Sequence, residues 1–515
     1  MNSRCFSLGA ALGLLAFASR GLAQEPRGLT EKDVVATAVS KNPSLHVALL
    51  QAQQSQYNLS AEEALYTPIF DANAGYTHGR TPSLSGPAGV VVTGSDVVDL
   101  GAGISKPLAY GTLLSATVAG QRSSRTTLEQ ARLLGANGPG YSLVGRLSAT
   151  QALLRGAGTD LGLASLRQAR LSLTESQLAA RDSASSLLSQ VVAAYWELWY
   201  STEAVRINQA SRQLARVQQL QAQQQVATGA LAPASALPYA TQVAQLEEDV
   251  LAAQTDARQR ELTLAQLLGE PGGVGKSLSA TDSPEPPTAD DPAEASAVSE
   301  ALQNSYARRQ LRTQLAILKD QLKIAGDPLR PRLDLDAYVQ AQGLGNRSVP
   351  PAFEEFGRFD AVSAHVGLTF EMPITDTRRT SQIQAAQIAA HITEKQLEDN
   401  ELTLRSSVAS TIAQRRAARE RLELSSQTEK VAHEQADAER ARFLAGGSIA
   451  ITVQQAEDAY RQAQLRVQRA RVDLVLADVA LAQVRGQLLT RYADAVKRLP
   501  AEQRVTLTNE AAGNF

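Results

Sequence analysis

The second half of the chain repeats the first, and this repeat limits the folds that the sequence can adopt. A turn at Gly229 opens a long run rich in Ala and Gln that ends at Gly269, and a similar run starts at Gly446 and ends at Gly486. Repeated helical units fold by packing against one another. The sequence therefore predicts a pseudo-symmetric assembly of two similar halves instead of a single catalytic pocket.

Two long segments contain almost no helix breakers. Residues 163–228 contain neither Gly nor Pro, and residues 374–499 contain no Pro. A helix rises about 1.5 Å per residue, so helices of roughly 65 to 70 residues would reach on the order of 100 Å. Helices of this length pack side by side, as in coiled coils. We expect two long helical hairpins, at about residues 160–269 and 376–492.

Strands with one apolar and one polar face are predicted before each hairpin, at about residues 68–154 and 331–374. In the second copy, residues 333–342 and 362–372 alternate strictly between apolar and polar side chains. Runs of about ten such residues match the length of a tilted strand that crosses a membrane. A half-buried sheet in a soluble protein would show the same alternation, so the pattern alone leaves both environments open.

The N-terminal residues are typical of a secretory signal peptide, expected at residues 1–23. Arg4 supplies a basic start, residues 6–18 are apolar, and small residues precede the expected cleavage site before Gln24. The sole cysteine, Cys5, lies in this segment, so the mature chain would have no disulfide and no thiolate metal site.

Composition argues against several classes of function. The formal net charge is −2, whereas a nucleic-acid-binding surface would be basic. No later run of apolar residues is long enough for a membrane-spanning helix. The five histidines lack metal-ligand spacing, and no catalytic constellation stands out. We expect no enzymatic activity, no metal, no cofactor and no nucleic-acid partner.

A series of short motifs along the chain matches one known family. They are Asn42-Pro43-Ser44-Leu45, Tyr66-Thr67-Pro68, Gln151-Ala152-Leu153-Leu154-Arg155-Gly156, Ala194-Tyr195-Trp196-Glu197-Leu198 and Arg442-Phe443-Leu444-Ala445-Gly446. In this order, and together with the repeat and the signal peptide, they make the chain similar to the TolC-like outer membrane efflux protein family (outer membrane factors). The resemblance covers nearly all of the mature sequence.

The resemblance implies a mainly α-helical fold with membrane β-structure. A homotrimer would form one outer-membrane β-barrel continuous with a long periplasmic α-helical barrel. Such a tube is the passive exit duct of a tripartite efflux or type I secretion system in a Gram-negative bacterium. Its partners would be a periplasmic adaptor (membrane fusion) protein, an inner-membrane transporter of the RND, ABC or MFS type, and outer-membrane lipid.

The domain organisation follows from the repeat. We expect a signal peptide (1–23), repeat 1 (24–269), a linker rich in Pro and Gly (270–292), repeat 2 (293–492) and a C-terminal tail (493–515).

The two copies are expected to contribute different numbers of strands. The first copy contains a further hairpin-like stretch, residues 98–122, and could supply four strands against two from the second. Three chains would then give 18 strands, or 12 if the extra hairpin lies outside the barrel wall. The sequence does not choose between these numbers.

The resemblance also assigns candidate sites. The helical turns would form the periplasmic tip where the adaptor docks: Thr228, Gly229, Ala230, Leu231, Phe443, Gly446, Gly447, Ser448 and Ile449. Positions that are acidic or ionic at the gate of the best-known member correspond to uncharged residues here, Ser235, Ser448, Thr452 and Gln455. This departure predicts a gate held by apolar and neutral hydrogen-bonding contacts. Polar strand residues expected to face the lumen are Asp334, Asp336, His365 and Glu371.

One alternative comes from a different class of protein. A secreted or periplasmic coiled-coil structural protein would also need long helices, but it would form no channel. Paired amphipathic strands at matching places in both copies favour the duct, because a coiled-coil rod has no use for them.

Overall fold

The computed structural model describes residues 27–85, 89–126, 139–270, 278–286, 290–372, 374, 376–445 and 447–508. The predicted signal peptide and Gly446 lie outside these residues. The chain divides into two compact units, and each is described by itself. The first unit holds residues up to 42, 190–288 and 417–478, and the second unit holds the rest.

Four long helices dominate the chain: α5 (Ala164–Ala227), α6 (Leu237–Leu267), α10 (Thr377–Leu444) and α11 (Ala450–Val484). With 64 and 68 residues, α5 and α10 have the length that the absence of Gly and Pro predicts, about 100 Å each. The helices α6 and α11 are shorter, with 31 and 35 residues.

Both shorter helices end in the same way. Gly269 follows α6 and Gly486 follows α11, and each has φ +69°. Glycine adopts this left-handed conformation without the steric cost that a Cβ atom brings. The next N–H group then donates back into the helix, from Glu270 to the Ala265 carbonyl at 3.0 Å in the first case. The two glycines that mark the repeat in the sequence are therefore helix caps.

The first unit also contains β1 (Arg27–Leu29), α1 (Glu31–Lys41), the 3-10 helix η2 (Pro233–Ala236) and β6 (Leu278–Ala280). The strands β1 and β6 pair in parallel. Strand β6 falls inside the segment predicted to be an irregular linker. It forms because its backbone has local partners: the Leu278 N–H donates to Glu261 Oε1 at 2.9 Å.

The aromatic run at the middle of α5 is buried in the first unit. Tyr195 is fully buried, and its hydroxyl donates to the Leu29 carbonyl at 3.1 Å and accepts from the Asp282 N–H at 3.1 Å. Trp196 Nε1 donates to Glu31 Oε2 at 3.0 Å. Burial raises the pKa of the Tyr195 hydroxyl well above its ordinary value. These aromatic residues join α5 to β1, α1 and the segment that follows β6.

The second unit contains an antiparallel sheet and a set of shorter helices. Its strands are β2 (Ile69–Ser85), β3 (Gly89–Leu108), β4 (Thr112–Thr126), β5 (Gly140–Ala152), β7 (Arg332–Asn346) and β8 (Val362–Glu371). Its helices, besides parts of α5, α10 and α11, are α2 (Pro43–Ala64), α4 (Thr159–Gly162), α7 (Glu294–Asn304), α8 (Tyr306–Gly326), η3 (Asp327–Leu329), α9 (Pro350–Arg358), α12 (Leu488–Arg491), α13 (Ala493–Val496) and α14 (Ala501–Leu507).

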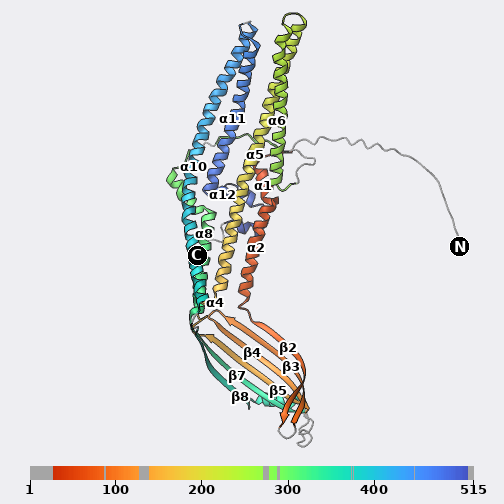
Figure 1. The fold of residues 1–515 in the computed structure, drawn as a ribbon, viewed down its shortest axis with the longest axis vertical. Coiled ribbons are helices and arrows are strands. Elements are labelled where there is room, and N and C mark those ends of the chain that lie inside the picture. The colour runs from red at the N-terminus through yellow and green to blue at the C-terminus, as the bar shows by residue number, and fades with distance from the viewer. Residues whose placement is uncertain are drawn as a thin grey trace, which may run out of the picture. The chain divides into compact units, whose positions relative to one another are not determined.

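All six strands form one continuous sheet in the order β2-β3-β4-β5-β7-β8, and every neighbouring pair is antiparallel (Figure 1). The register aligns apolar residues across the sheet, as in the row Phe70, Ile104, Ala116, Leu147, Val339 and Ala364. The next row on the other face is Asp71, Gly103, Thr117, Arg146, Gln340 and Ser363. The sheet is thus apolar on one face and polar on the other.

Helix α9 packs on the apolar face of β5 and β7. A Cβ atom on Gly343 would lie 1.9 Å from the Ala352 carbonyl oxygen, and one on Gly145 would lie 2.8 Å from the Phe356 ring. Glycine at these positions lets the helix approach the strands closely.

The helices of the second unit share an apolar core and two buried arginines with polar partners. Ala297, Ala301, Val408, Ile412 and Leu481 form a buried cluster that joins α7, α10 and α11. Arg415, 2% exposed, binds Asp291 at 2.5 Å, and Arg181 donates from Nε to the Thr506 carbonyl at 2.8 Å.

The prediction of a mainly helical fold with a sheet is confirmed. Among the described residues, no helix combines the length and the apolar character needed to cross a membrane. The limits of the repeats, the trimer and a closed barrel stay predictions.

Candidate functional site

The first helical turn joins α5 to η2 and contains the predicted docking residues Thr228, Gly229, Ala230 and Leu231. Gly229 has φ +75°, a conformation that favours glycine. The N–H groups of Ala230 and Leu231 donate to the Gln225 carbonyl at 2.8 and 3.1 Å, which caps the end of α5. The turn has a defined geometry, and its first three residues are exposed.

The second turn joins α10 to α11 and contains Phe443, Gly447, Ser448 and Ile449. The Gly447 N–H donates to the Arg442 carbonyl at 2.8 Å, which closes the end of α10. Ser448, a predicted docking residue, donates from Oγ to a carboxylate that the sequence analysis missed, Glu439 Oε2, at 3.0 Å. An uncharged residue of this turn is therefore held by a charged one from the preceding helix.

Aliphatic side chains project from the second turn into solvent. Leu444 is 82% exposed, Ile449 65% and Ile451 50%. Phe443 is half-buried. Three large, exposed aliphatic side chains thus lie within eight residues of the chain at this turn. Exposed apolar surface of this kind marks interaction sites.

One of the predicted gate residues, Gln455, lines a groove in the first unit between the start of α6 and the start of α11, whereas Ser235 and Thr452 are not part of its lining. The groove has a volume of about 520 Å³ and includes Gln455 in its lining. Ser235 is exposed in η2, and Thr452 is half-buried in the first turn of α11. Gln454 lies in the same lining and is 8% exposed.

Charged residues that the sequence analysis missed link the helices near these turns. Arg461 of α11, whose side chain is 13% exposed, binds Asp249 of α6 at 3.0 Å and Asn208 of α5 at 2.7 Å. Asp458, one turn earlier on α11, also binds Arg461, at 2.6 Å. The groove is therefore bordered by an ion-pair cluster, although the predicted gate positions themselves are neutral.

A second contact group, closer to the turns, joins three helices through one carboxylate. Glu457 of α11 accepts from Gln218 Nε2 of α5 at 2.8 Å and lies 3.2 Å from Arg440 of α10.

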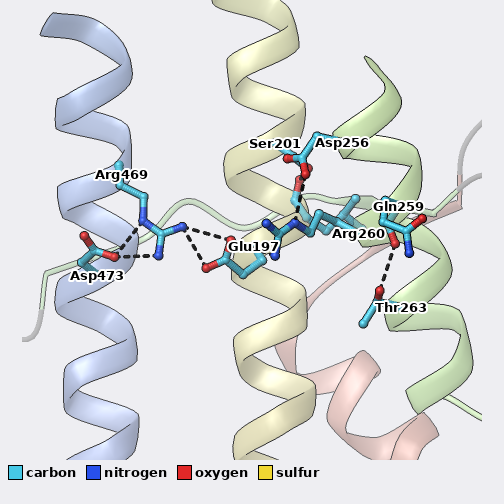
Figure 2. A network of polar contacts seen from close by, with 9 residues as sticks. Glu197, Ser201, Asp256, Gln259, Arg260, Thr263, Arg469 and Asp473 are labelled. Atoms are coloured by element: carbon cyan, nitrogen blue, oxygen red, sulfur yellow. Dashed lines mark hydrogen bonds and ion pairs between the residues drawn. The ribbon is translucent and has the colours of Figure 1, made fainter. Parts of the chain in front are cut away.

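Further along the same helices, Glu197 of α5 lies between two arginines (Figure 2). Arg469 of α11 donates to both Glu197 oxygens at 2.8 and 3.0 Å, and Arg260 of α6 lies 3.5 Å away. Each arginine also binds an aspartate of its own helix four residues away, Asp473 at 2.8 Å and Asp256 at 3.3 Å. The Glu197 side chain is 17% exposed, so this contact joins α5, α6 and α11 in a partly buried setting.

Burial and charge act on Arg469 in opposite directions. Burial lowers its pKa, but the hydrogen bonds and negative charges of Asp473 and Glu197 outweigh this effect, and the pKa is raised overall. Arg469 therefore stays charged, and its Cζ lies 5.4 Å from the Tyr200 ring centroid. The sequence carried a signal for this cluster: opposite charges four residues apart on α6 and again on α11.

The structure brings the four predicted strand residues to the polar face of the sheet. Asp336 accepts from Thr150 Oγ1 at 3.0 Å and from Thr369 Oγ1 at 3.2 Å. Asp334 and Glu371 both contact Arg332, at 2.5 and 3.7 Å. His365 stacks on Tyr338 with ring centroids 5.1 Å apart. The guanidinium carbon Cζ of Arg146 lies 4.4 Å from the centroid of the same Tyr338 ring. The polar face of the sheet is cross-linked by hydrogen bonds.

Among the described residues, no group of His, Cys, Asp and Glu is placed to hold a metal ion.

Comparison with known proteins points to a single family. Residues 297–487 match the family model described as outer membrane efflux protein. A search of curated protein sequences gives no significant match.

Solved structures of outer membrane channels share the fold over most of the chain. The CmeC outer membrane channel of Campylobacter jejuni is 12% identical with a TM-score of 0.67, and the match covers 93% of this chain and 90% of that one. VceC of Vibrio cholerae is 14% identical with a TM-score of 0.63, covering 88% of this chain and 96% of VceC. The open-state MtrE channel of Neisseria gonorrhoeae is 17% identical with a TM-score of 0.56, covering 89% of each chain.

The resemblance found in the sequence motifs is thereby confirmed: residues 297–487 match the outer membrane efflux protein family, and solved outer membrane channels share the fold over most of the chain.

Proposed function

We propose that the protein is the passive outer-membrane exit duct of a tripartite efflux or type I secretion system. Three copies would close a β-barrel in the outer membrane, continuous with a helical tube in the periplasm. An inner-membrane transporter of the RND, ABC or MFS type and a periplasmic adaptor would complete the path. The duct performs no chemistry, and the energised transporter sets the direction of transport.

The observation that carries this proposal is the exposed apolar face of the sheet. Phe70, Leu147 and Val366 are 71%, 65% and 74% exposed, and all three belong to this face. Large exposed apolar surfaces mark membrane or protein interfaces. A barrel with this face toward lipid and the polar face toward its lumen gives both faces a suitable environment. A coiled-coil structural protein, the alternative, gives the sheet no role.

The two helical turns are proposed as the adaptor-docking tip. The aliphatic side chains of Leu444, Ile449 and Ile451 supply an apolar patch that a partner could bury. The residues Ser235, Thr452 and Gln455, just beyond the turns, are proposed as a neutral gate. Such a gate offers divalent cations no acidic ring to bind.

Extraction and conductance test the duct. The protein purified from outer membranes should require detergent, run as a trimer and conduct ions in a planar bilayer. Recovery from the periplasm without detergent, with no conductance, would rule out the proposal. At the gate, a strong block by a multivalent cation added on the periplasmic side would contradict neutral gate residues.

Docking has its own test at the second turn. Ile449→Asp should abolish cross-linking to the adaptor encoded with the same transport system, because it places a charge in the buried patch. Ile449→Leu, the matched control, should preserve the cross-link. Equal cross-linking of both variants would exclude this turn as the docking surface.

A further inference from the structure

The sheet of the second unit has two open edges. Within the described residues, β2 pairs only with β3, and β8 pairs only with β7. All residues of β8 except Gly367 are exposed. Each edge strand therefore presents a row of backbone N–H and C=O groups with no ladder partner in the part of the chain that the structure describes.

The hairpin β3–β4, which distinguishes the first copy from the second, is an integral part of this sheet. Its turn packs against the chain segment that connects β5 to α5. The Ala152 N–H donates to the Gly111 carbonyl at 3.2 Å, and the Gly158 N–H donates to the Tyr110 carbonyl at 3.2 Å. A Cβ atom on Gly162 would lie 1.9 Å from the Ala109 carbonyl oxygen. Glycine thus permits close backbone contact at this turn.

Open edges are incompatible with a sheet whose apolar face meets lipid. Backbone groups in the hydrocarbon region have no water to bond, so sheets that span membranes are closed. On the apolar face, large exposed side chains stand at both edges: Phe70 on β2, and Leu368 and Phe370 on β8. Strand direction allows closure: neighbouring strands alternate in direction, so β8 of one copy runs antiparallel to β2 of the next.

We infer that β8 of each copy pairs with β2 of the next copy, so that three copies close an 18-stranded barrel. Six strands per chain and three chains give this number. The inference rests on the proposed trimeric duct and assigns the extra hairpin to the barrel wall. Barrel diameter grows roughly in proportion to strand number, so the barrel is about 1.5 times wider than a 12-stranded one.

Disulfide cross-linking between copies tests the pairing. The sequence has a single cysteine, Cys5, in the predicted signal peptide, so introduced cysteines can be studied without background. Ala364→Cys or Phe370→Cys on β8 is combined in turn with a cysteine at each apolar-face position of β2 from Phe70 to Tyr76. Paired strands bring Cα atoms within disulfide range. At least one combination should give covalent dimers and trimers on oxidation.

The competing arrangement has its own set of cysteines. If β2 and β3 lie outside the wall, β8 would pair with β4, so the same β8 cysteines are combined with positions from Leu114 to Gly120. If the extra hairpin β3–β4 lies outside, β2 and β5 lose these neighbours, so the pairs Phe70→Cys with Ile104→Cys and Ala116→Cys with Leu147→Cys, which face each other in the sheet, would not link within one chain. The pair Val339→Cys and Ala364→Cys, which face each other across β7 and β8, is the control and should link only within one chain.

The outcomes separate this inference from the proposed function. Intermolecular links to β2, together with links of β2 to β3 and of β4 to β5 within one chain, support the 18-stranded barrel. Links to β4, or loss of the links of β3 and β4 to their neighbours, overturn it. A conducting trimer that links to neither strand also overturns it and leaves the duct intact. A protein that is neither trimeric nor membrane-bound overturns both proposals. Eighteen strands in a density map of the detergent-extracted trimer would be an independent confirmation.

Discussion

Replacing Glu197 by Gln should loosen the contact between α5 and its neighbours α6 and α11. The substitution keeps the size of the side chain and removes the charge that Arg469 and Arg260 share. Hydrogen bonds to charged groups contribute about 1.5–3 kcal/mol each. The two arginines are 38% and 44% exposed, so solvent screens part of this energy.

Both arginines also keep an aspartate partner on their own helix after the change, Asp473 and Asp256. We therefore expect a loss of about 1–2 kcal/mol in the free energy of local opening. Because 1.4 kcal/mol corresponds to a factor of ten, this loss amounts to roughly 5- to 30-fold faster amide hydrogen exchange where opening limits exchange. The effect should centre on α11 around Arg469.

Glu203→Gln is the matched control for this experiment. Glu203 binds Arg206 three residues later on α5 itself, and Arg206 is 69% exposed. Glu203→Gln removes an ion pair within one helix and should change the rate of amide hydrogen exchange by no more than about twofold. Hydrogen exchange measured by mass spectrometry on the detergent-extracted protein compares the two variants. Equal exchange in α11 for both would refute the view that Glu197 holds these helices together.

Three further changes have defined expectations. Gly343→Val should destabilise the sheet by more than about 2 kcal/mol, because the new Cβ atom would meet the backbone of α9. Gly357→Ala, the control, has open space around the new Cβ atom and should be neutral or stabilising. Thermal unfolding followed by circular dichroism compares the two variants. Burial raises the pKa of Tyr195 above its ordinary value of 10.0. The stability that its neutral form contributes is therefore complete below pH 10 and is lost as the pH rises beyond it. Tyr195→Phe should lower the free energy of unfolding at neutral pH by about 1–2 kcal/mol, but this free energy should fall less steeply with rising alkaline pH than that of the parent protein. Arg461→Gln removes the cation that the carboxylates of Asp249 and Asp458 share. It should therefore speed proteolysis of α6 and α11 near the turns several-fold. Arg466→Gln, which changes an exposed arginine of α11, is the control and should leave the rate of proteolysis unchanged.

The absence of helix breakers made the long helices predictable from the sequence, whereas the contacts between neighbouring helices were not predictable. The absence of Gly and Pro before Thr228 predicted α5 as one helix, because these two residues are the ones that break helices at highest cost. Arg461 and Asp249 are far apart in the sequence, and their pairing depends on how α6 packs against α11. No local pattern contains that information.

The strands show the same division between local and non-local information. Strict alternation located β7 and β8, because side chains of a strand point to opposite faces in turn. The number of strands in one sheet stayed open, since the pairing of β5 with β7 joins residues nearly 200 positions apart. Strand β6 was missed because three residues are too few to show a period.

The charged contacts near the turns also bear on how a tip of this kind could open. Within one chain, Arg461 ties α11 to both α5 and α6, and Glu457 ties α11 to α5 and α10. Separating the two hairpins of a chain would break the contacts of Arg461 with α5 and α6 and that of Glu457 with Gln218 of α5, at about 1.5–3 kcal/mol for each charged hydrogen bond. The predicted gate residues Thr452 and Gln455 are neutral, so in the proposed trimer their separation from a neighbouring chain would leave neither of them as an unpaired charge. For that trimer we therefore expect opening between chains, with each chain's turns moving as one body, to be the less costly motion.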